Sequence, residues 1–360
     1  KLGAWQYFFD AYTDKLPDPM GQPQALIIST LSLEPFTARG NAQLNKHLLQ
    51  FTHGLEYLQS MLEYQPIYLV IPKTENELGV RIKEQVRGYA WAKLVEVPLE
   101  YTRDNFNILA RHLGLKNADG PIWGVRTEGI LAVDTVLTHT RASTERIISI
   151  GGPAVKNPEH VRVVTGFPIA EIKKQYAAEE PVRVINGGFL TGVTLDEENL
   201  GIDTECTGIT VLPEHTEREF LGWLRPGSDR SSYSNSFLSS LSAKFAERFT
   251  PAMRGEKRAC VACSFCEEVC PAGIMPYLIH RYLYSDLIEE ADAARVDLCV
   301  ECGLCSFVCP SKIELRQEFI EAKVLIEVEK AEAEALRIKQ EETVKKEQER
   351  REESSEENLY

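Results

Sequence analysis

Long hydrophobic stretches are absent from this chain of 360 residues. No uninterrupted apolar run approaches the roughly 18–20 residues that a membrane-spanning helix needs. Positive charge is also in deficit, with 40 Lys and Arg against 54 Asp and Glu and a formal net charge of −14. This balance argues against nucleic acid as a partner and against direct binding to an anionic bilayer. We therefore expect no direct membrane span, and any membrane association should go through a partner protein.

Familiar catalytic constellations are missing as well. The seven His residues form no metal-binding pattern, and no Ser/His/Asp set or carboxylate pair stands out, which disfavours hydrolysis and group transfer. Cysteine is absent from residues 1–205, and of the nine Cys residues only Cys206 lies outside the segment 260–309. Disulfide scaffolds spread their cysteines through small secreted chains, so we expect a reduced, cytoplasmic protein with a metal site. Cys206 is interpreted as a packing thiol, with a redox role as the alternative.

The other eight cysteines form one motif that occurs twice. The copies are Cys260-x-x-Cys263-x-x-Cys266-x-x-x-Cys270-Pro271 and Cys299-x-x-Cys302-x-x-Cys305-x-x-x-Cys309-Pro310. Three thiolates at this spacing wrap around three corners of an iron–sulfur cube, and in two-cluster proteins the fourth ligates the other cube. The motif therefore predicts two [4Fe–4S] clusters. The predicted ligands are Cys260, Cys263, Cys266 and Cys309 for the first cluster, and Cys299, Cys302, Cys305 and Cys270 for the second. A pair of zinc sites is the alternative, although zinc favours two Cys-x-x-Cys knuckles or Cys/His mixtures.

The first part of the chain alternates apolar runs with helical patterns. A short apolar run at 25–30 predicts a buried parallel strand, and the runs at 67–71 and 93–97 predict a second and a third strand. Apolar residues at helical spacing predict helices at 41–64, 75–89, 106–113 and 129–138. Strand–helix–strand units of this length imply right-handed crossovers. We expect a Rossmann-like α/β domain with a layered sheet over residues 1–142, and we expect the natural protein to have residues before Lys1.

Three further segments follow. Over residues 143–226, β-branched runs alternate with turns that contain Gly and Pro. The runs lie at 147–150, 161–164, 182–185 and 208–212. This pattern predicts a mostly antiparallel β domain with a short helix at 170–176. Residues 227–330 begin with a Ser- and Gly-rich connection and carry the cysteines in helical sequence, with a linker helix at 274–288. Residues 331–360 predict a charged helical tail with Glu–Lys pairs at i,i+4 spacing, and 357–360 resemble the start of a cleavable expression tag. An exposed tail is the simple interpretation, and docking onto a partner is the alternative.

Several segments resemble a known family. The sequence CVECGLCSFVCPSKI at 299–313 is similar to the cysteine region of the C subunit of Rnf electron-transport complexes. IGGPAVKNP at 150–158 resembles the β-grasp (SLBB) domain that the Rnf protein shares with the A subunit of sodium-translocating NADH:quinone reductase. EFLGWLRPG at 219–227 and WQY at 5–7 are closer to the reductase protein. Typical members of that reductase family lack the paired cysteine motifs, so the chain resembles a hybrid of the two.

The resemblance implies the fold of the flavoprotein subunit of respiratory complex I, namely a Rossmann-like domain, an SLBB domain and an α-helical ferredoxin domain. It also implies a candidate flavin crevice, in which Glu34 and Pro35 follow the first predicted strand and Glu128 ends the sequence VRTE. Both segments follow strand ends, where open α/β sheets bind ligands. FMN and NADH are therefore candidate cofactors, although the Gly-rich loop that holds them in the family is missing from this sequence. Glu34 as an ordinary turn carboxylate is the alternative.

The function that the resemblance implies is electron transfer. The chain would belong to a membrane-associated NADH (or ferredoxin):quinone oxidoreductase, at the inner face of the cell membrane. It would pass electrons through its two clusters to the redox and integral-membrane subunits of a respiratory complex. One alternative is a soluble flavin and iron–sulfur reductase that resembles the cobalamin reductases of bacterial microcompartments. Another is a structural adaptor in which the clusters only hold helices together.

Overall fold

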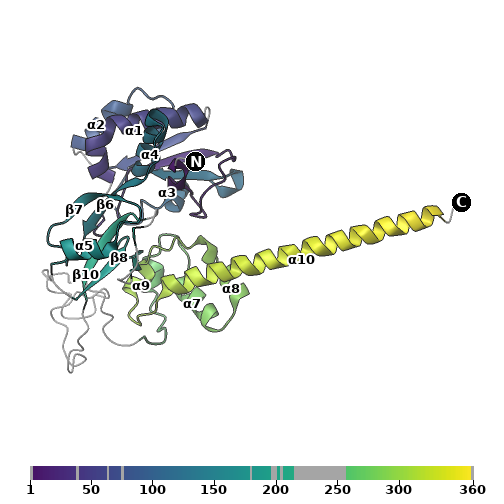
Figure 1. Ribbon diagram of the computed structural model, residues 1–360. Helices are drawn as coiled ribbons and strands as arrows, with labels where there is room; N and C mark the ends of the chain where they lie inside the picture. Colours follow the sequence, from purple (N-terminus) through teal and green to yellow (C-terminus); the bar gives the residue numbers. More distant parts are fainter. Residues whose placement is uncertain are drawn as a thin grey trace. The chain divides into compact units, whose positions relative to one another are not determined.

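The structure is a computed structural model that describes residues 3–37, 40–62, 65–73, 77–178, 181–195, 201–202, 206–214 and 257–357. The chain separates into two compact units, Lys1–Gly255 and Glu256–Tyr360, which are coloured purple to teal and green to yellow (Figure 1). The predicted connection after residue 226 and the segment EFLGWLRPG lie outside the described residues. The domain boundaries at 142, 226 and 330 stay predictions.

The first unit contains a five-stranded sheet of mostly parallel strands. Its order is β1-β5-β2-β3-β4, and only the pairing of β1 with β5 is antiparallel. The strands are β1 (Phe8–Asp10), β2 (Ala25–Ser29), β3 (Ile67–Pro72), β4 (Ala92–Val97) and β5 (Ile122–Arg126). The predicted strands at 25–30, 67–71 and 93–97 correspond to β2, β3 and β4. Strand β5 was missed because Gly124 interrupts its apolar run. A Cβ at Gly124 would lie 2.6 Å from the ring of Phe106, so close packing requires glycine there.

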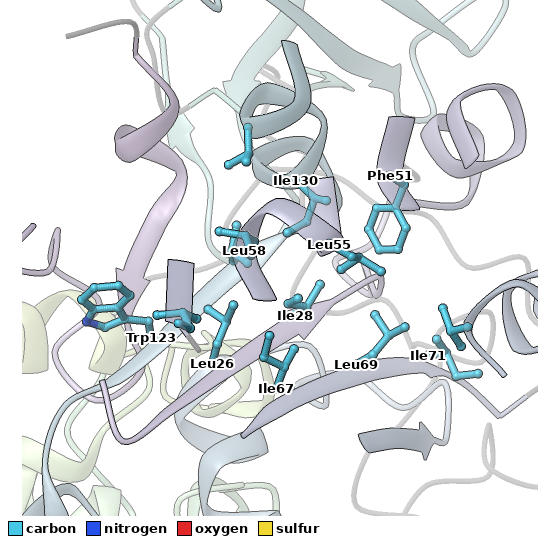
Figure 2. Close-up of a cluster of buried hydrophobic side chains, with 14 of the residues drawn as sticks. Leu26, Ile28, Phe51, Leu55, Leu58, Ile67, Leu69, Ile71, Trp123 and Ile130 are labelled. Carbon is cyan, nitrogen blue, oxygen red and sulfur yellow. The ribbon is translucent and has the colours of Figure 1, made fainter. Parts of the chain in front are cut away.

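Apolar side chains bury both faces of this sheet. The helices are α1 (Gly40–Leu62), α2 (Glu77–Val86), α3 (Phe106–His112) and α4 (Thr127–His139), and 3-10 turns lie at Ala4–Tyr7 and Asn117–Asp119. Side chains alternate along β2, so Leu26 and Ile28 pack with α1 and α4 while Ile27 packs with α3. Figure 2 shows the first of these clusters between the sheet and the helices. The Rossmann-like character of the unit stays a prediction.

A second five-stranded sheet completes the described part of this unit. Its order is β7-β6-β10-β8-β9, and only β6 and β10 pair in parallel. The elements are β6 (Glu145–Gly151), β7 (Glu159–Val164), α5 (Ile169–Tyr176), β8 (Val182–Asn186), β9 (Val193–Thr194) and β10 (Gly208–Pro213). The expected strands and the short helix are all present. Cys206 is buried in the core of this sheet, and its thiol donates to the carbonyl of Gly208 at 3.7 Å.

The second unit is helical. Its elements are α6 (Phe265–Glu268), α7 (Pro276–Tyr284), α8 (Ile288–Ala293), a 3-10 turn (Val296–Leu298), α9 (Leu304–Val308) and α10 (Leu315–Glu357). The linker predicted as one helix is two, α7 and α8, because the chain turns at Asp286 with a φ of 56°. The tail helix predicted from residue 331 begins at Leu315, since Phe319 and Ile326 of its first turns are buried. No helix among the described residues offers a stretch long and apolar enough to cross a bilayer.

Candidate functional site

The two cysteine loops of the second unit share one backbone conformation. Ala262 and Ser264 have φ angles of 51° and 62°, and Glu301 and Gly303 have φ angles of 54° and 78°. In both loops these residues stand directly before and after the second cysteine of the motif. Turns of this kind direct successive N–H groups into a concave anion-binding site, as found at many iron–sulfur centres. Three of the four residues carry a Cβ, which makes the conformation unfavourable by roughly 1–2 kcal/mol at each.

The eight cysteines of the motifs line two separate hollows. The first hollow is lined by Cys260, Cys263, Cys266 and Cys309, and the second hollow by Cys270, Cys299, Cys302 and Cys305. Each takes three cysteines from one loop and the last cysteine of the other motif. This arrangement arises because α6 and α9 are short and carry the chain away from its own loop before the fourth cysteine.

Several of these thiols are withdrawn from water. Cys266 and Cys305 are buried, whereas Cys263 is exposed. Burial raises the pKa of Cys266 and of Cys302 to about 11, and that of Cys305 to about 12. Metals bind the thiolate, so these side chains would ionise near neutral pH only when positive charge enters the hollow. Thiols alone in such a position would remain protonated.

The donor set fits an iron–sulfur cube. Each hollow offers four sulfurs and no imidazole, and its loop has the positive-φ residues that are typical of anion-binding turns. The N–H of Glu301 lies 3.4 Å from Sγ of Cys299, which is an N–H···S hydrogen bond. Among the described residues, no three His, Cys, Asp or Glu side chains are grouped as ligands of a single metal ion.

Helix α10 closes the second hollow. Arg316 lines this hollow, its backbone N–H donates to Ser306 Oγ at 2.9 Å, and its Nε donates to the carbonyl of Glu301 at 2.7 Å. Lys323, two turns further on, forms an ion pair with Glu301 and donates to the carbonyl of Cys299 at 3.0 Å. Neither cation was among the predicted site residues. Their only sequence signal is a spacing of seven residues, which puts Arg316 and Lys323 on one helix face, six and thirteen residues after Pro310.

A second polar network fastens α10 to α7. The Nδ1 atom of the buried His280 lies 2.6 Å from Oε2 of Glu318, and Lys257 Nζ lies 3.1 Å from Oε1 of the same carboxylate. Near the first hollow, Ser311 Oγ donates to the carbonyl of Ala259 at 2.9 Å. These bonds connect the segment before the first motif to the segment after the second. The residues that flank the two cysteine loops in the sequence are therefore bonded to each other.

In the first unit, the carboxylate of Glu34 holds a turn of the second sheet. Its Oε1 accepts hydrogen bonds from the N–H groups of Leu190 at 2.7 Å and Thr191 at 3.0 Å. A Cβ at Gly188 would lie 1.6 Å from Cγ of Glu34, so a side chain at that position would displace the carboxylate. The adjacent Pro35 is partly exposed. Glu34 follows β2, as the sequence predicts, but its carboxylate is engaged within the chain.

Glu128 is engaged as well. It lies in the first turn of α4, and Arg146 of β6 grips its carboxylate in a bidentate pair, with Nε–Oε1 at 3.2 Å and Nη2–Oε2 at 3.0 Å. Both side chains are buried, and the guanidinium stacks over the ring of Tyr7 at 5.2 Å. Burial alone would lower the pKa of Arg146, but the hydrogen bonds and charge of Glu128 outweigh it and raise that pKa. The pair connects the two sheets, and no local sequence pattern indicated Arg146 as its partner.

Family models match two parts of the chain. Residues 147–197 match the NQRA C-terminal domain, an SLBB domain, and residues 259–314 match the 4Fe-4S dicluster domain. The second match covers both cysteine motifs. The mixed α/β sheets, the SLBB domain and a ferredoxin-type domain are thus present in one chain. The dicluster match and the clustered cysteines support iron–sulfur centres.

Curated relatives match over most of this chain. The A subunit of the Na(+)-translocating NADH-quinone reductase from Psychromonas ingrahamii is 28% identical over 296 residues, covering 81% of this chain and 63% of the relative. Its counterpart from Haemophilus influenzae is 27% identical over 299 residues, again covering 81% and 63%. The chain therefore spans less than two thirds of the length of these relatives. A crystal structure of NAD+-reducing [NiFe]-hydrogenase in the H2-reduced state is weakly similar, with a TM-score of 0.44 and 12% identity. The match covers 53% of this chain and 41% of that one. The matches bear out the resemblance drawn from the sequence, and they relate this chain to the Rnf C/NqrA-like family.

Proposed function

We propose that the chain is an electron-transfer subunit of a membrane-associated NADH (or ferredoxin):quinone oxidoreductase, and that its two hollows hold [4Fe–4S] clusters. The observation that carries the proposal is the division of eight cysteines into two hollows, each with three thiols from one loop and one from the other. The dicluster match supports it, and so does the name of the relatives, which are part of a sodium-translocating NADH-quinone reductase.

The chain's own residues bind, shield and position the clusters. The eight thiolates would ligate the irons, and the N–H groups of the two turns would donate to the sulfides. Bound clusters supply reversible one-electron transfer, while the protein sets position and potential. Phe319 of α10, with no exposed surface, keeps water from the unit's core. The exposed Cys263 gives the first hollow an edge through which a partner's redox centre can approach.

The finer parts of the proposal concern location, partners and flavin. We place the chain at the inner face of the cell membrane, bound to integral-membrane and redox subunits, with its first sheet forming a Rossmann-like domain. FMN and NADH binding near Glu34, Pro35 and Glu128 stays a prediction. The carboxylates of Glu34 and Glu128 already accept hydrogen bonds within the chain.

The experiment is an anaerobic purification of the whole chain with counts of iron, sulfide, zinc and flavin. We expect about eight irons, from two clusters of four, and EPR signals after reduction with dithionite. The Cys302→Ser variant should lose about half of the iron, and Cys206→Ala should retain all of it. A colourless protein that carries zinc would contradict the proposal, and reduction by added NADH would support the flavin prediction.

A further inference from the structure

The two hollows differ in the charge of their walls. The first hollow is lined only by cysteines and by the uncharged residues Val261, Ser264, Tyr277, Pro310, Ser311, Ile313 and Leu315. The wall of the second hollow includes Glu301 and Arg316. Two clusters with the same four-thiolate ligation would therefore lie in unequal fields. This asymmetry was not indicated by the two motifs, which are alike in spacing.

Arg316 supplies the uncompensated charge at the second hollow. Lys323 forms an ion pair with Glu301, so these two charges largely cancel. The Arg316 side chain donates instead to a neutral group, the backbone carbonyl of Glu301, at 2.7 Å. Among the described residues its guanidinium makes no ion pair. The half-buried side chain is fixed by this bond, and screening by solvent is weaker there than on an open surface.

We infer that Arg316 is a positioning residue that selectively raises the reduction potential of the cluster in the second hollow and biases an electron shared by the two clusters toward it. The inference rests on the proposed clusters. Uptake of one electron makes a cluster and its thiolates more negative by one charge, and a fixed cation stabilises that charge. The uncharged wall of the first hollow offers no such stabilisation. At separations of several ångströms in a medium of effective dielectric about 20–40, the effect is on the order of tenfold in the equilibrium constant.

The test is a redox titration of the whole chain with dithionite, followed by EPR. The signal of the second cluster is identified by its loss in the Cys302→Ser variant. Arg316→Gln should weaken reduction of that cluster about tenfold, which is 59 mV for one electron, and leave the other signal in place. Arg316→Lys, which keeps the charge, should restore most of the shift. Glu301→Gln removes the negative charge and frees Lys323, so it should shift the same signal in the opposite direction.

A matched control lies on the same helix. Arg337→Gln makes the same chemical change about 30 Å further along α10, well beyond the screening length, and should move neither signal. Movement of both signals by equal amounts in Arg316→Gln, or no movement, would overturn the inference. If Arg316→Gln fails to load iron, Arg316→Met replaces it, and the absence of a downward shift of the second cluster's signal overturns the inference. Absence of two iron–sulfur signals in the unaltered protein would instead refute the proposed function.

Discussion

Removal of one partner of the buried pair between Arg146 and Glu128 should strongly destabilise the first unit. The side chains are only 4% and 10% exposed, and two hydrogen bonds of 3.2 Å and 3.0 Å join them. Glu128→Gln leaves a buried guanidinium without its counter-charge, and breaking such a pair costs about 3–5 kcal/mol. Urea unfolding followed by tryptophan fluorescence measures the difference in free energy of unfolding.

The chain offers a matched control for this prediction. Arg162 and Glu145 form a 3.1 Å pair on neighbouring strands of the second sheet, but their side chains are 61% and 57% exposed. Arg162→Met should change the free energy of unfolding by no more than about 1 kcal/mol. The double variant Glu128→Leu with Arg146→Met should be more stable than Glu128→Gln, because no charge remains buried. Equal costs for Glu128→Gln and Arg162→Met would refute the reasoning.

Three further predictions concern other parts of the molecule. Glu34→Ala removes the acceptor of two backbone N–H groups, so we expect the free energy of unfolding in urea to fall by about 2 kcal/mol. Hydrogen exchange at the N–H of Leu190 should become faster, and an unchanged exchange rate would contradict this prediction. Burial and then a hydrogen bond with Glu159 raise the pKa of Tyr176 to about 12, so the neutral phenol stabilises the fold below pH 10 and this contribution is lost between about 10 and 12. The difference in tyrosinate absorbance between the native protein and Tyr176→Phe should have its midpoint near pH 12. A midpoint at the ordinary tyrosine pKa of about 10 would contradict this prediction. Phe319→Ala should cost about 3–5 kcal/mol and weaken iron retention, whereas full retention at native stability would show that α10 is dispensable.

Local patterns predicted much of the fold because the relevant forces act over short distances along the chain. The runs that became β2 and β3 are continuous and apolar, as expected for strands buried on both faces, whereas the edge strand β4 contains Lys93 and Glu96 and is largely exposed. β5 escaped because Gly124, required by the ring of Phe106, breaks the pattern. Because each cysteine loop is short, the spacing of the cysteines restricts which thiols can share a hollow. The binding of clusters by these thiols stays a prediction.

Contacts between distant segments could not be predicted in the same way. Glu34 finds its partners more than 150 residues later, at the turn that contains Leu190. The charge pattern indicated a helix after residue 331, but its true start at Leu315 depends on Phe319 being buried against the cysteine loops. The cation Arg316 likewise acquires meaning only when α10 closes the second hollow. The partners in such contacts depend on three-dimensional packing between segments that are far apart in the sequence.

The exchange of fourth ligands between the loops can be measured directly. EPR spectra of the reduced protein would be compared for the variants Cys263→Ser, Cys302→Ser, Cys309→Ser and Cys270→Ser. If the hollows hold the clusters as described, Cys309→Ser alters the same signal as Cys263→Ser, and Cys270→Ser the same signal as Cys302→Ser. Should the Cys309 variant instead reproduce the spectrum of the Cys302 variant, each loop would ligate its own cluster with its own four cysteines, contrary to this account.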